Sequence, residues 1–530
     1  MHYQSAKTRY KKHKLDHRKK VGSITQYGRQ ITGETQYSAR DIRLRTFKGW
    51  QGKVFQFVQH KQEERYRKLL EDGLEVKQAQ AEIKKPVPPL IVAQYMAELL
   101  TVCRIESDEG TKPVYFYNPD EGIYINDREF LKDFISIIEP RHNEKRASDC
   151  IYHLTRKAPH RQAENAPHLI IVGNGIYNRK TRTLEPFTET RVFTHKIQTN
   201  YNPHAQSPTI KGWEFNGWLL DLFNGDKELY QLSLQLLNAV VRGESYAKMF
   251  WFVGEGGTGK GTLQELFINL IGRQNIASIK ITDLDVNNRF TLAQAIGKQA
   301  IIGDDVQAGA VIRDTSKLFS LVGGDTVTVE KKGKDAYSTF IKTVVIQSTN
   351  TLPKIRGDYY AIRRRMVILP FNKHFKGKPN RAIKNDYITR PSVLEYVLKT
   401  VIDLDFKDFI EPSKSIDLLD EYQEAIDPVL AFSQNLFTNL HSTFIPNDWV
   451  WWYFTGFADY HNFQHNFSSQ GFHTHFPQYL PDDWEKLAYP ISLPRGADLP
   501  KGFYPKDDQP HYLPLYVPIK GKAQRGYKKK

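Results

Sequence analysis

A strand, a glycine-rich loop and a helix in the middle of the chain constrain its fold more than any other feature. The run AKMFWFV is typical of a buried strand, and LQELFINLIG is typical of an amphipathic helix. The loop between them fits the pattern GxxxxGK, with Gly254, Gly259 and Lys260. Glycines let the backbone turn tightly, so that successive N–H groups and the positive end of the helix dipole face an anion. The sequence therefore predicts a phosphate-binding loop rather than a glycine turn with a chance lysine.

This loop is expected to hold ATP and its metal ion. Lys260 would reach the β- and γ-phosphates as a point charge. The next position usually carries a Ser or Thr whose hydroxyl ligates Mg²⁺, but here it is Gly261. Either Thr262 takes over as the metal ligand, or water fills that position. The residues predicted to bind the nucleotide are Gly254, Glu255, Gly256, Gly257, Thr258, Gly259, Lys260, Gly261 and Thr262.

A second apolar run, KQAIIGDDV, supplies the acidic residues that such a loop needs for Mg²⁺ and the attacking water. We expect a strand through Ala300–Ile302 with two acids at its carboxyl end, Asp304 on the Mg²⁺ side and Asp305 on the water side. Adjacent acids after a strand are a weak signal alone, because a surface turn can show them. About forty residues after a phosphate-binding loop, they predict a catalytic role.

Two further runs carry polar residues at positions suited to phosphate chemistry. The strand-like KTVVIQSTN ends in Asn350, which could orient the lytic water or sense the γ-phosphate, or simply cap a turn. In YYAIRRRMVILPF, three arginines precede an apolar run. A guanidinium binds two phosphate oxygens at once, so one of these arginines is a candidate finger for a neighbouring subunit's nucleotide. The alternative is a solvated basic edge.

Between these elements, VTVEKK and AYSTFIK alternate as hairpin strands do, with GKD at the turn. This pattern places Lys331, Lys332 and Lys334 near the hairpin tip. Lysines on a projecting hairpin can bind a DNA backbone without contacting its bases. Hairpin tips are also often basic only because they are exposed, so this feature alone favours neither interpretation.

The charge of the chain lies mostly at its two ends. The formal net charge is +16, and residues 1–20 hold eight Lys/Arg against one Asp, while residues 520–530 hold six Lys/Arg and no acid. Basic tails are typically solvated and favour polyanions through counterion release, although they also serve solubility alone. The two cysteines exclude a disulfide scaffold. With no long apolar run and no apolar segment after the basic N-terminus, we expect a cytoplasmic protein, in a bacterial host.

Composition shifts and breakers along the 530 residues predict several units. The fold class expected is α/β, with a mixed α+β domain before the P-loop core and a small domain after it. The predicted boundaries are 1–90 for a basic arm and helical linker, 91–214 for the α+β domain, 215–374 for the ATPase core, 375–519 for a helical C-terminal region, and 520–530 for a basic tail.

Together the motifs resemble superfamily 3 helicases, the AAA+-related motors of small viruses, phages, plasmids and other mobile elements, and most closely their poxvirus and phage primase–helicase branch. The resemblance rests on GEGGTGKGT, GDD, GGDTVTVEKKGK, STNTLP and the Arg364–Arg365 pair in RRRMVILPF. It covers roughly Ile91 to Phe371. More weakly, DPVLAFSQNLF and IPNDWVWWYFTGF are similar to the winged-helix-type segment that ends family members.

The resemblance implies a replicative DNA helicase that forms a ring, usually a hexamer, with ATP and Mg²⁺ between subunits. The hairpin lysines would then line a channel and move single-stranded or forked DNA, generally 3′ to 5′. Many relatives carry a primase domain; because residues 1–90 hold no acidic cluster for two metals and no cysteine-based zinc site, we expect no primase activity and a separate primase as a candidate partner. Two alternatives stay open, an ATP-dependent initiator that melts origin DNA and a P-loop phosphotransferase.

The C-terminal region shows two aromatic-rich patterns. His461, His465, His473 and His475 cluster in DYHNFQHNFSSQGFHTHF, but without cysteines and among aromatics they favour packing over a metal site. The run WVWWYF could stack bases, although these aromatics are more typical of a small domain's core.

Overall fold

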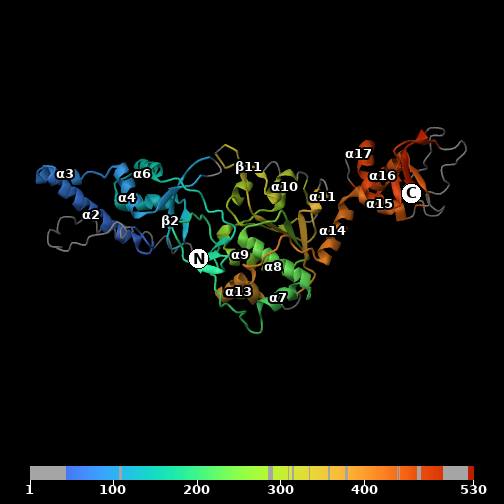
Figure 1. Cartoon of the computed structure of the whole chain (residues 1–530), viewed down its shortest axis with the longest axis horizontal. Helices are drawn as coiled ribbons and strands as arrows, with labels where there is room; N and C mark the ends of the chain where they lie inside the picture. The colour runs from blue at the N-terminus through green and yellow to red at the C-terminus, as the bar shows by residue number, and fades with distance from the viewer. Residues whose placement is uncertain are drawn as a thin grey trace.

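The protein is described by a computed structural model, which shows an elongated molecule with three parts (Figure 1). A helical N-terminal part and a smaller C-terminal part flank a central sheet covered by helices. The described residues are 43–106, 110–284, 290–307, 310–312, 315–333, 335–355, 359–375, 380–438, 440, 442–461, 463, 467–492 and 523–530.

The centre of the molecule is a five-stranded sheet in which every neighbouring pair is parallel. The strands are short, rich in β-branched and aromatic residues, and buried on both faces. This pattern is expected where helices cover both sides of a parallel sheet. This confirms the predicted α/β core. Across the sheet, the strands follow the order β15 (Met366–Pro370), β7 (Met249–Val253), β13 (Val344–Thr349), β9 (Ala300–Val306) and β8 (Ile276–Ala277).

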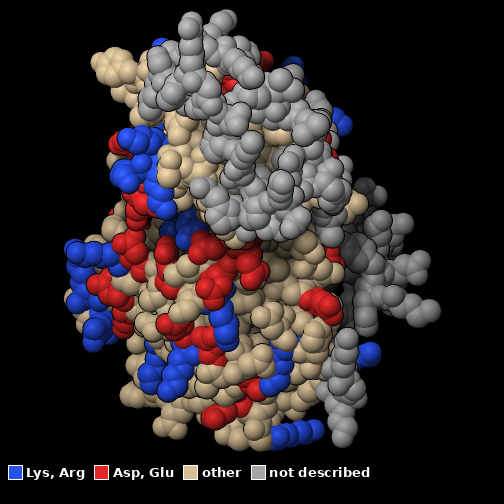
Figure 2. All heavy atoms as spheres, turned by 90° about the vertical axis from the view of Figure 1, so that its right-hand side faces the viewer, with Lys and Arg blue, Asp and Glu red and all other residues tan. Residues whose placement is uncertain are grey.

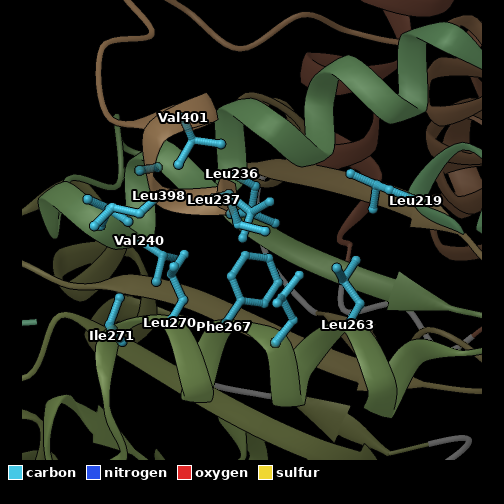
Figure 3. Packing of buried hydrophobic residues seen from close by; sticks show 14 of the residues in the cluster. Leu219, Leu236, Leu237, Val240, Leu263, Phe267, Leu270, Ile271, Leu398 and Val401 are labelled. Carbon is cyan, nitrogen blue, oxygen red and sulfur yellow. The ribbon is translucent and has the colours of Figure 1, made fainter. Parts of the chain in front are cut away.

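Alternate residues of the central strands point into two different cores, as the two-residue period of a strand requires. Phe250 and Phe252 belong to one cluster, whereas Met249 and Trp251 belong to the other. On the first face, helices pack against the strands in one buried cluster. Figure 3 shows residues of α7, α8, α9 and α13 from this cluster. These helices are α7 (Phe215–Leu222), α8 (Lys227–Arg242), α9 (Lys260–Ile271) and α13 (Pro391–Val401).

The second face of the sheet is covered by α10 (Ser316–Gly323) and α14 (Ser413–Ile426) together with a hairpin. The hairpin strands β11 (Thr326–Val329) and β12 (Tyr337–Phe340) pair antiparallel, which confirms the hairpin predicted from alternation. The remaining short elements of this part are β10 (Val311–Ile312), β14 (Lys354–Ile355), α11 (Tyr359–Arg363), α12 (Arg381–Asn385) and the 3-10 turns Arg273–Asn275, Ile281–Leu284, Leu292–Ala295 and Tyr387–Thr389.

The N-terminal part has a core of its own, made by helices around a three-stranded antiparallel sheet. Trp50 and Val54 pack in this core with Phe134, so residues on both sides of position 90 share it. Likewise, the central cluster contains Ile170 and Tyr177, from before position 214. The elements of the N-terminal part are α2 (Trp50–Glu71), α3 (Val76–Ile83), α4 (Pro89–Leu99), β1 (Val102–Arg104), β2 (Val114–Asn118), β3 (Ile123–Ile125), α5 (Arg128–Ile138) and α6 (Glu144–Lys157). They are followed by a three-stranded sheet that contributes to the central cluster, β4 (Leu169–Val172), β5 (Gly175–Asn178) and β6 (Thr183–Glu185).

The C-terminal part packs three helices against a small sheet whose middle strand is the end of the chain. Strand β20 lies between β16 and β17, and Tyr527 within it is completely buried. The basic segment 520–530 therefore differs from the expected solvated tail, because its last residues pair as a strand and contribute to a core. The elements are α15 (Pro428–Thr438), β16 (Phe444–Pro446), α16 (Asn447–Tyr460), α17 (Ser469–His475), the 3-10 turn Phe476–Tyr479, β17 (Trp484–Lys486), β18 (Ile491–Ser492), β19 (Ala523–Gln524) and β20 (Gly526–Lys529).

Further expectations concern the C-terminal aromatics, the basic N-terminus and membrane spans. Trp449, Tyr453 and Phe454 are buried in the C-terminal core, which confirms the packing interpretation for these three residues. The basic N-terminal residues 1–20 lie outside the described residues. Over the parts of the chain that are described, no helix has the length and apolar character needed to cross a bilayer.

Candidate functional site

The predicted loop joins the carboxyl end of β7 to the amino end of α9, which begins at Lys260. Gly254 leaves β7 beside another strand end, and a Cβ at this position would lie 2.3 Å from the carbonyl oxygen of Phe371. Gly259, with a φ of 97°, adopts a left-handed conformation just before the helix, and its Cβ would meet Leu222 at 2.6 Å. Both positions therefore require glycine, the first for close approach and the second also for its backbone angle.

The turn of the loop leaves a run of backbone donors available to an anion. Within the described part of the chain, no acceptor is bonded to the backbone N–H groups of Gly256, Gly257, Thr258 or Gly259. These groups precede α9, in whose first turn the described residues provide no acceptor for the N–H groups of Lys260 and Gly261, whereas the N–H of Thr262 donates to the carbonyl oxygen of Gly259. Free N–H donors next to the positive end of a helix dipole are the arrangement that binds phosphate.

Lys260 lies within this turn rather than in solvent. Only 7% of its surface is exposed, and its ammonium donates to the carbonyl oxygens of Gly254 and Glu255. Burial lowers the pKa of this lysine, while the nearby charges of Asp305 and Asp304 act in the opposite direction. The lysine thus sits inside the predicted loop, with both predicted acids close enough to influence its charge.

The hydroxyl-bearing residues of the loop have different environments. Thr258 is almost completely buried and its hydroxyl donates to the carbonyl oxygen of Glu255, which holds the turn closed. Thr262 is half-buried in the first turn of α9. Gly261 precedes it, and a Cβ there would have no contact shorter than 3.6 Å, so space does not exclude a side chain at that position.

The two acids lie at the carboxyl end of β9, where the strand pairing with β13 becomes irregular. The Ser348 hydroxyl donates to the carboxylate of Asp304 over 2.6 Å. Asp305 has a φ of 49°, a left-handed conformation that is uncommon for a residue with a side chain. Both carboxylates are exposed at the edge of the sheet. Carboxylate oxygens with open access are the ligands that Mg²⁺ takes in addition to phosphate and water.

A glycine and a glutamine that sequence reasoning missed hold this end of the sheet together. Gln347 is completely buried on β13, and its amide bonds the backbone of Ile279 and Ile281. A Cβ at Gly303 would lie 2.2 Å from the Gln347 side chain. The glycine before the two acids is therefore needed to admit Gln347. The signal available in the sequence was Gln347 itself, a polar residue in an otherwise apolar strand.

Asn350 directly follows β13, which confirms its predicted place at a strand end. Its side-chain oxygen lies 3.5 Å from the ammonium of Lys260. Because β7, β13 and β9 are neighbours and parallel, their carboxyl ends meet at one edge. The structure thereby brings together Lys260, Asp304, Asp305 and Asn350, four of the six residues predicted to be catalytic.

The other two, Arg364 and Arg365, lie at the opposite edge of the same sheet. The backbone N–H of Met249, the first residue of β7, donates to the carbonyl oxygen of Arg365 over 2.6 Å. The predicted phosphate-binding loop starts five residues later, at the far end of β7. A strand rises about 3.3 Å per residue, so about 17 Å of sheet separates the arginine pair from the loop. That span is longer than an arginine side chain.

The hairpin lysines differ in how they are held. The ammonium of Lys331 lies 5.7 Å from the centre of the Tyr337 ring, whereas Lys332 is exposed at the tip. Lys334 lies outside the described residues.

Acidic side chains gather in a band on the face of the molecule that carries the C-terminal part (Figure 2), so this face is not a continuous basic surface.

The histidine cluster is not assembled around one point in the described residues. His473 is buried, and its Nδ1 pairs with the Tyr527 hydroxyl at 2.8 Å, while His465 lies outside the described residues. Among the residues that the structure describes, no group of three potential metal ligands comes together.

The segment after β15 also encloses the loop, which the sequence did not reveal. The Phe371 N–H donates to the carbonyl oxygen of Val253, and the Phe375 N–H donates to that of Gly257. His374 lies 3.7 Å from the carboxylate of Glu255. Residues 371–375 therefore form one wall of the site.

Comparisons with protein families match three stretches of the chain. Residues 7–224 match a family described as D5 N terminal like, and residues 424–508 match one described as poxvirus D5 protein-like. Residues 252–365, which contain the loop and the acids, match a family of unknown function, DUF5906.

Solved structures of the C-terminal region of NrS-1 in its apo state are similar to this chain. One is 14% identical, covers 84% of this chain and 100% of its own, and has a TM-score of 0.46. An A form is 13% identical with the same coverages and a TM-score of 0.48. Another A form is 14% identical, covers 66% of this chain and 79% of its own, and has a TM-score of 0.44.

Proposed function

Because this chain belongs to the D5-like family of phage and poxvirus primase–helicases, we propose that it is an ATP-dependent DNA helicase that translocates on single-stranded DNA as a ring. The family membership itself implies a DNA-binding replication protein. ATP hydrolysis, Mg²⁺, the ring and its translocation are the finer parts of the proposal.

The first support is the fit between the loop and a nucleoside triphosphate. The unbonded N–H groups of Gly256 to Gly259 offer donors in a single turn, and Lys260 adds a positive charge beside them. In the proposal, phosphate oxygens replace the loop carbonyls as acceptors for the Lys260 ammonium. A buried ammonium with lowered pKa gains a favourable partner when an anion enters.

The second support is the group of acidic and amide side chains facing the loop. Asp304, oriented by Ser348, would hold Mg²⁺ together with Thr262 or water, and the ion would neutralise charge on the transferred phosphate. Asp305 would accept a proton from the attacking water, and Asn350 would orient that water.

The proposal that the protein forms a ring rests on the position of Arg364. This arginine lies at the amino edge of the sheet, about 17 Å of strand away from the loop of its own chain. An arginine that serves phosphate chemistry from there must reach the nucleotide of a neighbouring subunit. Nucleotide bound between subunits is what couples hydrolysis to movement in a ring, and a hexamer is our proposal for its size.

The hairpin supplies the proposed DNA contact. Its strands β11 and β12 lie between α10 and β13 in the chain. In the proposal, a change at the nucleotide site would reach the hairpin through β13. Lys332, exposed at the tip, would contact the DNA backbone. The proposal assigns the same role to Lys331 and Lys334. Such contacts carry no base specificity, as translocation along any sequence requires.

The test is ATP hydrolysis with and without single-stranded DNA over a range of salt concentrations. We expect DNA to stimulate hydrolysis, the stimulation to weaken as salt rises, and the protein to separate a forked duplex. Lys260→Ala serves as the inactive control. Hydrolysis at one rate with or without DNA, by a protein that stays monomeric, would exclude the proposal.

A replication initiator is the second candidate, favoured by the same family membership. It would hydrolyse ATP and melt origin DNA but leave a forked duplex intact. Strand displacement therefore separates the two candidates.

A further inference from the structure

We propose that Lys384 is a second phosphate-binding lysine of the nucleotide site, acting within its own chain. The inference rests on the proposed function, because it assigns a further ligand to the same nucleotide. The ligand class is a nucleoside di- or triphosphate, bound through its phosphate chain.

The position of Lys384 relative to the loop carries the inference. A Cβ built at Gly261 would lie 3.6 Å from the Lys384 ammonium. Gly261 is the second residue of α9, directly after Lys260. The Lys384 ammonium therefore lies over the first turn of that helix, although 123 residues of sequence separate it from Gly261.

The element that carries Lys384 is fixed to the core beside α9. Neighbouring Ala382 and Ile383 pack against the central hydrophobic cluster. The side-chain oxygen of Asn380 accepts a hydrogen bond from the N–H of Ala382, which caps α12. The amide of Asn269 on α9 donates to the carbonyl oxygen of Ile388 in the following 3-10 turn. These contacts hold the backbone of Lys384 in place against α9.

The charge of Lys384 is not matched by an anion in its surroundings. Its side chain is exposed, and no described residue forms a hydrogen bond or ion pair with it. The Lys384 ammonium lies at the amino end of α9, where the helix dipole disfavours a positive charge. Lys260, also positive, is one residue away from Gly261. Two ammonium groups at a positive helix end are an arrangement that an anion between them stabilises.

This arrangement also concerns position 261, where a Cβ would be in ordinary contact with the Lys384 ammonium. A usual P-loop has a hydroxyl there, whose oxygen ligates Mg²⁺, whereas Gly261 leaves this side of the helix open. The Lys384 ammonium occupies the adjoining space and can donate hydrogen bonds to phosphate oxygens. Phosphates would then be held between Lys260 on the loop side and Lys384 on the α12 side.

The test is equilibrium binding of a fluorescent ATP analogue and the corresponding ADP analogue to Lys384→Ala. The variant loses one hydrogen-bond donor to a charged group, and Lys384 is exposed, so both Kd values should rise about tenfold. The ATPase KM should rise in parallel. The dependence of binding on salt should become shallower, because one positive charge is gone.

Two further variants separate phosphate binding from structural effects. Lys384→Arg keeps a cation and should keep most of the affinity. Lys407→Ala is the matched control, since this exposed lysine follows Phe406, which stacks on Tyr246 before the start of β7, away from the loop. It should bind both analogues as the unaltered protein does.

The outcomes are distinct. If Lys384→Ala binds both analogues as tightly as Lys407→Ala does, the inference is overturned while the proposed function stands. If the unaltered protein binds neither analogue, both the proposed function and the inference fail. A tenfold loss in Lys384→Ala with the affinity kept in Lys384→Arg supports the inference.

Discussion

Arg364 and Arg365 are consecutive in the chain, but their side chains lie in different environments at the amino end of the central sheet. The Arg365 guanidinium lies 4.8 Å from the centre of the Phe319 ring and donates to the carbonyl oxygen of Ala361. Arg364 is exposed beside a cavity of about 220 Å³, and no described residue forms a hydrogen bond or ion pair with its side chain. In the proposed ring, Arg364 is therefore the member of the pair that would reach a neighbouring subunit.

We predict that Arg364→Ala lowers ATP turnover by about 10³-fold and leaves ATP binding nearly unchanged. Arginine fingers contribute about that much to turnover because they stabilise charge that develops in the transition state. Turnover is measured as phosphate release and binding as fluorescence of a nucleotide analogue. A variant that turns over at the normal rate would remove Arg364 from the mechanism.

Mixing subunits distinguishes a trans arginine from a local effect. Arg364→Ala and Lys260→Ala should each be inactive alone, but their mixture forms boundaries with an intact Lys260 facing an intact Arg364. We expect the mixture to recover part of the activity. Arg365→Ala is the structural control: it loses the Phe319 contact and should lower the melting temperature. Absence of recovery in a mixed, assembled ring would argue against nucleotide at a subunit boundary.

Lys260→Ala is predicted to abolish ATP binding without unfolding the protein. The buried ammonium bonds two loop carbonyls, so its removal takes away the charge inside the turn while the hydrophobic cores are untouched. The measurement is the rise in melting temperature on adding ATP, which is expected for the unaltered protein and not for the variant. An unchanged rise in the variant would contradict a role for Lys260 in binding.

Lys332→Ala is predicted to separate ATP use from DNA movement. Its side chain is exposed at the hairpin tip, whereas Lys331 is held over the Tyr337 ring. Basal hydrolysis should persist, DNA stimulation should fall, and the salt dependence of DNA binding should decrease by about one phosphate contact. Lys407→Ala provides the matched loss of one exposed charge. Full unwinding by Lys332→Ala would remove the hairpin tip from the mechanism.

The sequence predicted the local elements of the site because each has a strong short-range pattern. Continuous apolar runs ending in polar residues located β7, β9 and β13, and the parallel arrangement then placed Lys260, Asp304 and Asn350 at one edge. Alternation on both sides of a Gly-containing turn located the β11–β12 hairpin. These features depend on residues close together in the chain.

What the sequence could not predict depends on contacts between distant segments. The need for glycine at Gly303 arises from Gln347, and the need at Gly254 arises from the carbonyl of Phe371. The approach of Lys384 to α9 has no local pattern at all. Lysine-rich composition suggested a solvated C-terminal tail, but pairing of β20 with two other strands buries Tyr527 and overrides that tendency.

The C-terminal part should lose stability in mild acid because of His473. Burial, with a smaller effect of the Lys486 charge, lowers the pKa of His473 from its usual 6.5 to about 4. The folded state therefore favours the neutral ring, and the unfolded chain binds more protons between these two values. Stability contributed by the neutral ring is complete above pH 6.5 and is lost as the pH falls toward 4, by about 3 kcal/mol in total.

His473→Gln removes this titration but keeps an acceptor for the Tyr527 hydroxyl, which pairs with the His473 ring at 2.8 Å. Urea unfolding of the full chain, followed by tryptophan fluorescence, measures the effect because Trp449 and Trp484 lie in this core. We expect the unaltered protein to lose more stability than the variant between pH 6.5 and 4. Since other acidic groups titrate equally in both proteins, only the difference reports His473. Parallel pH profiles would show that the His473 ring binds a proton in the folded protein as readily as in the unfolded chain, contrary to its burial.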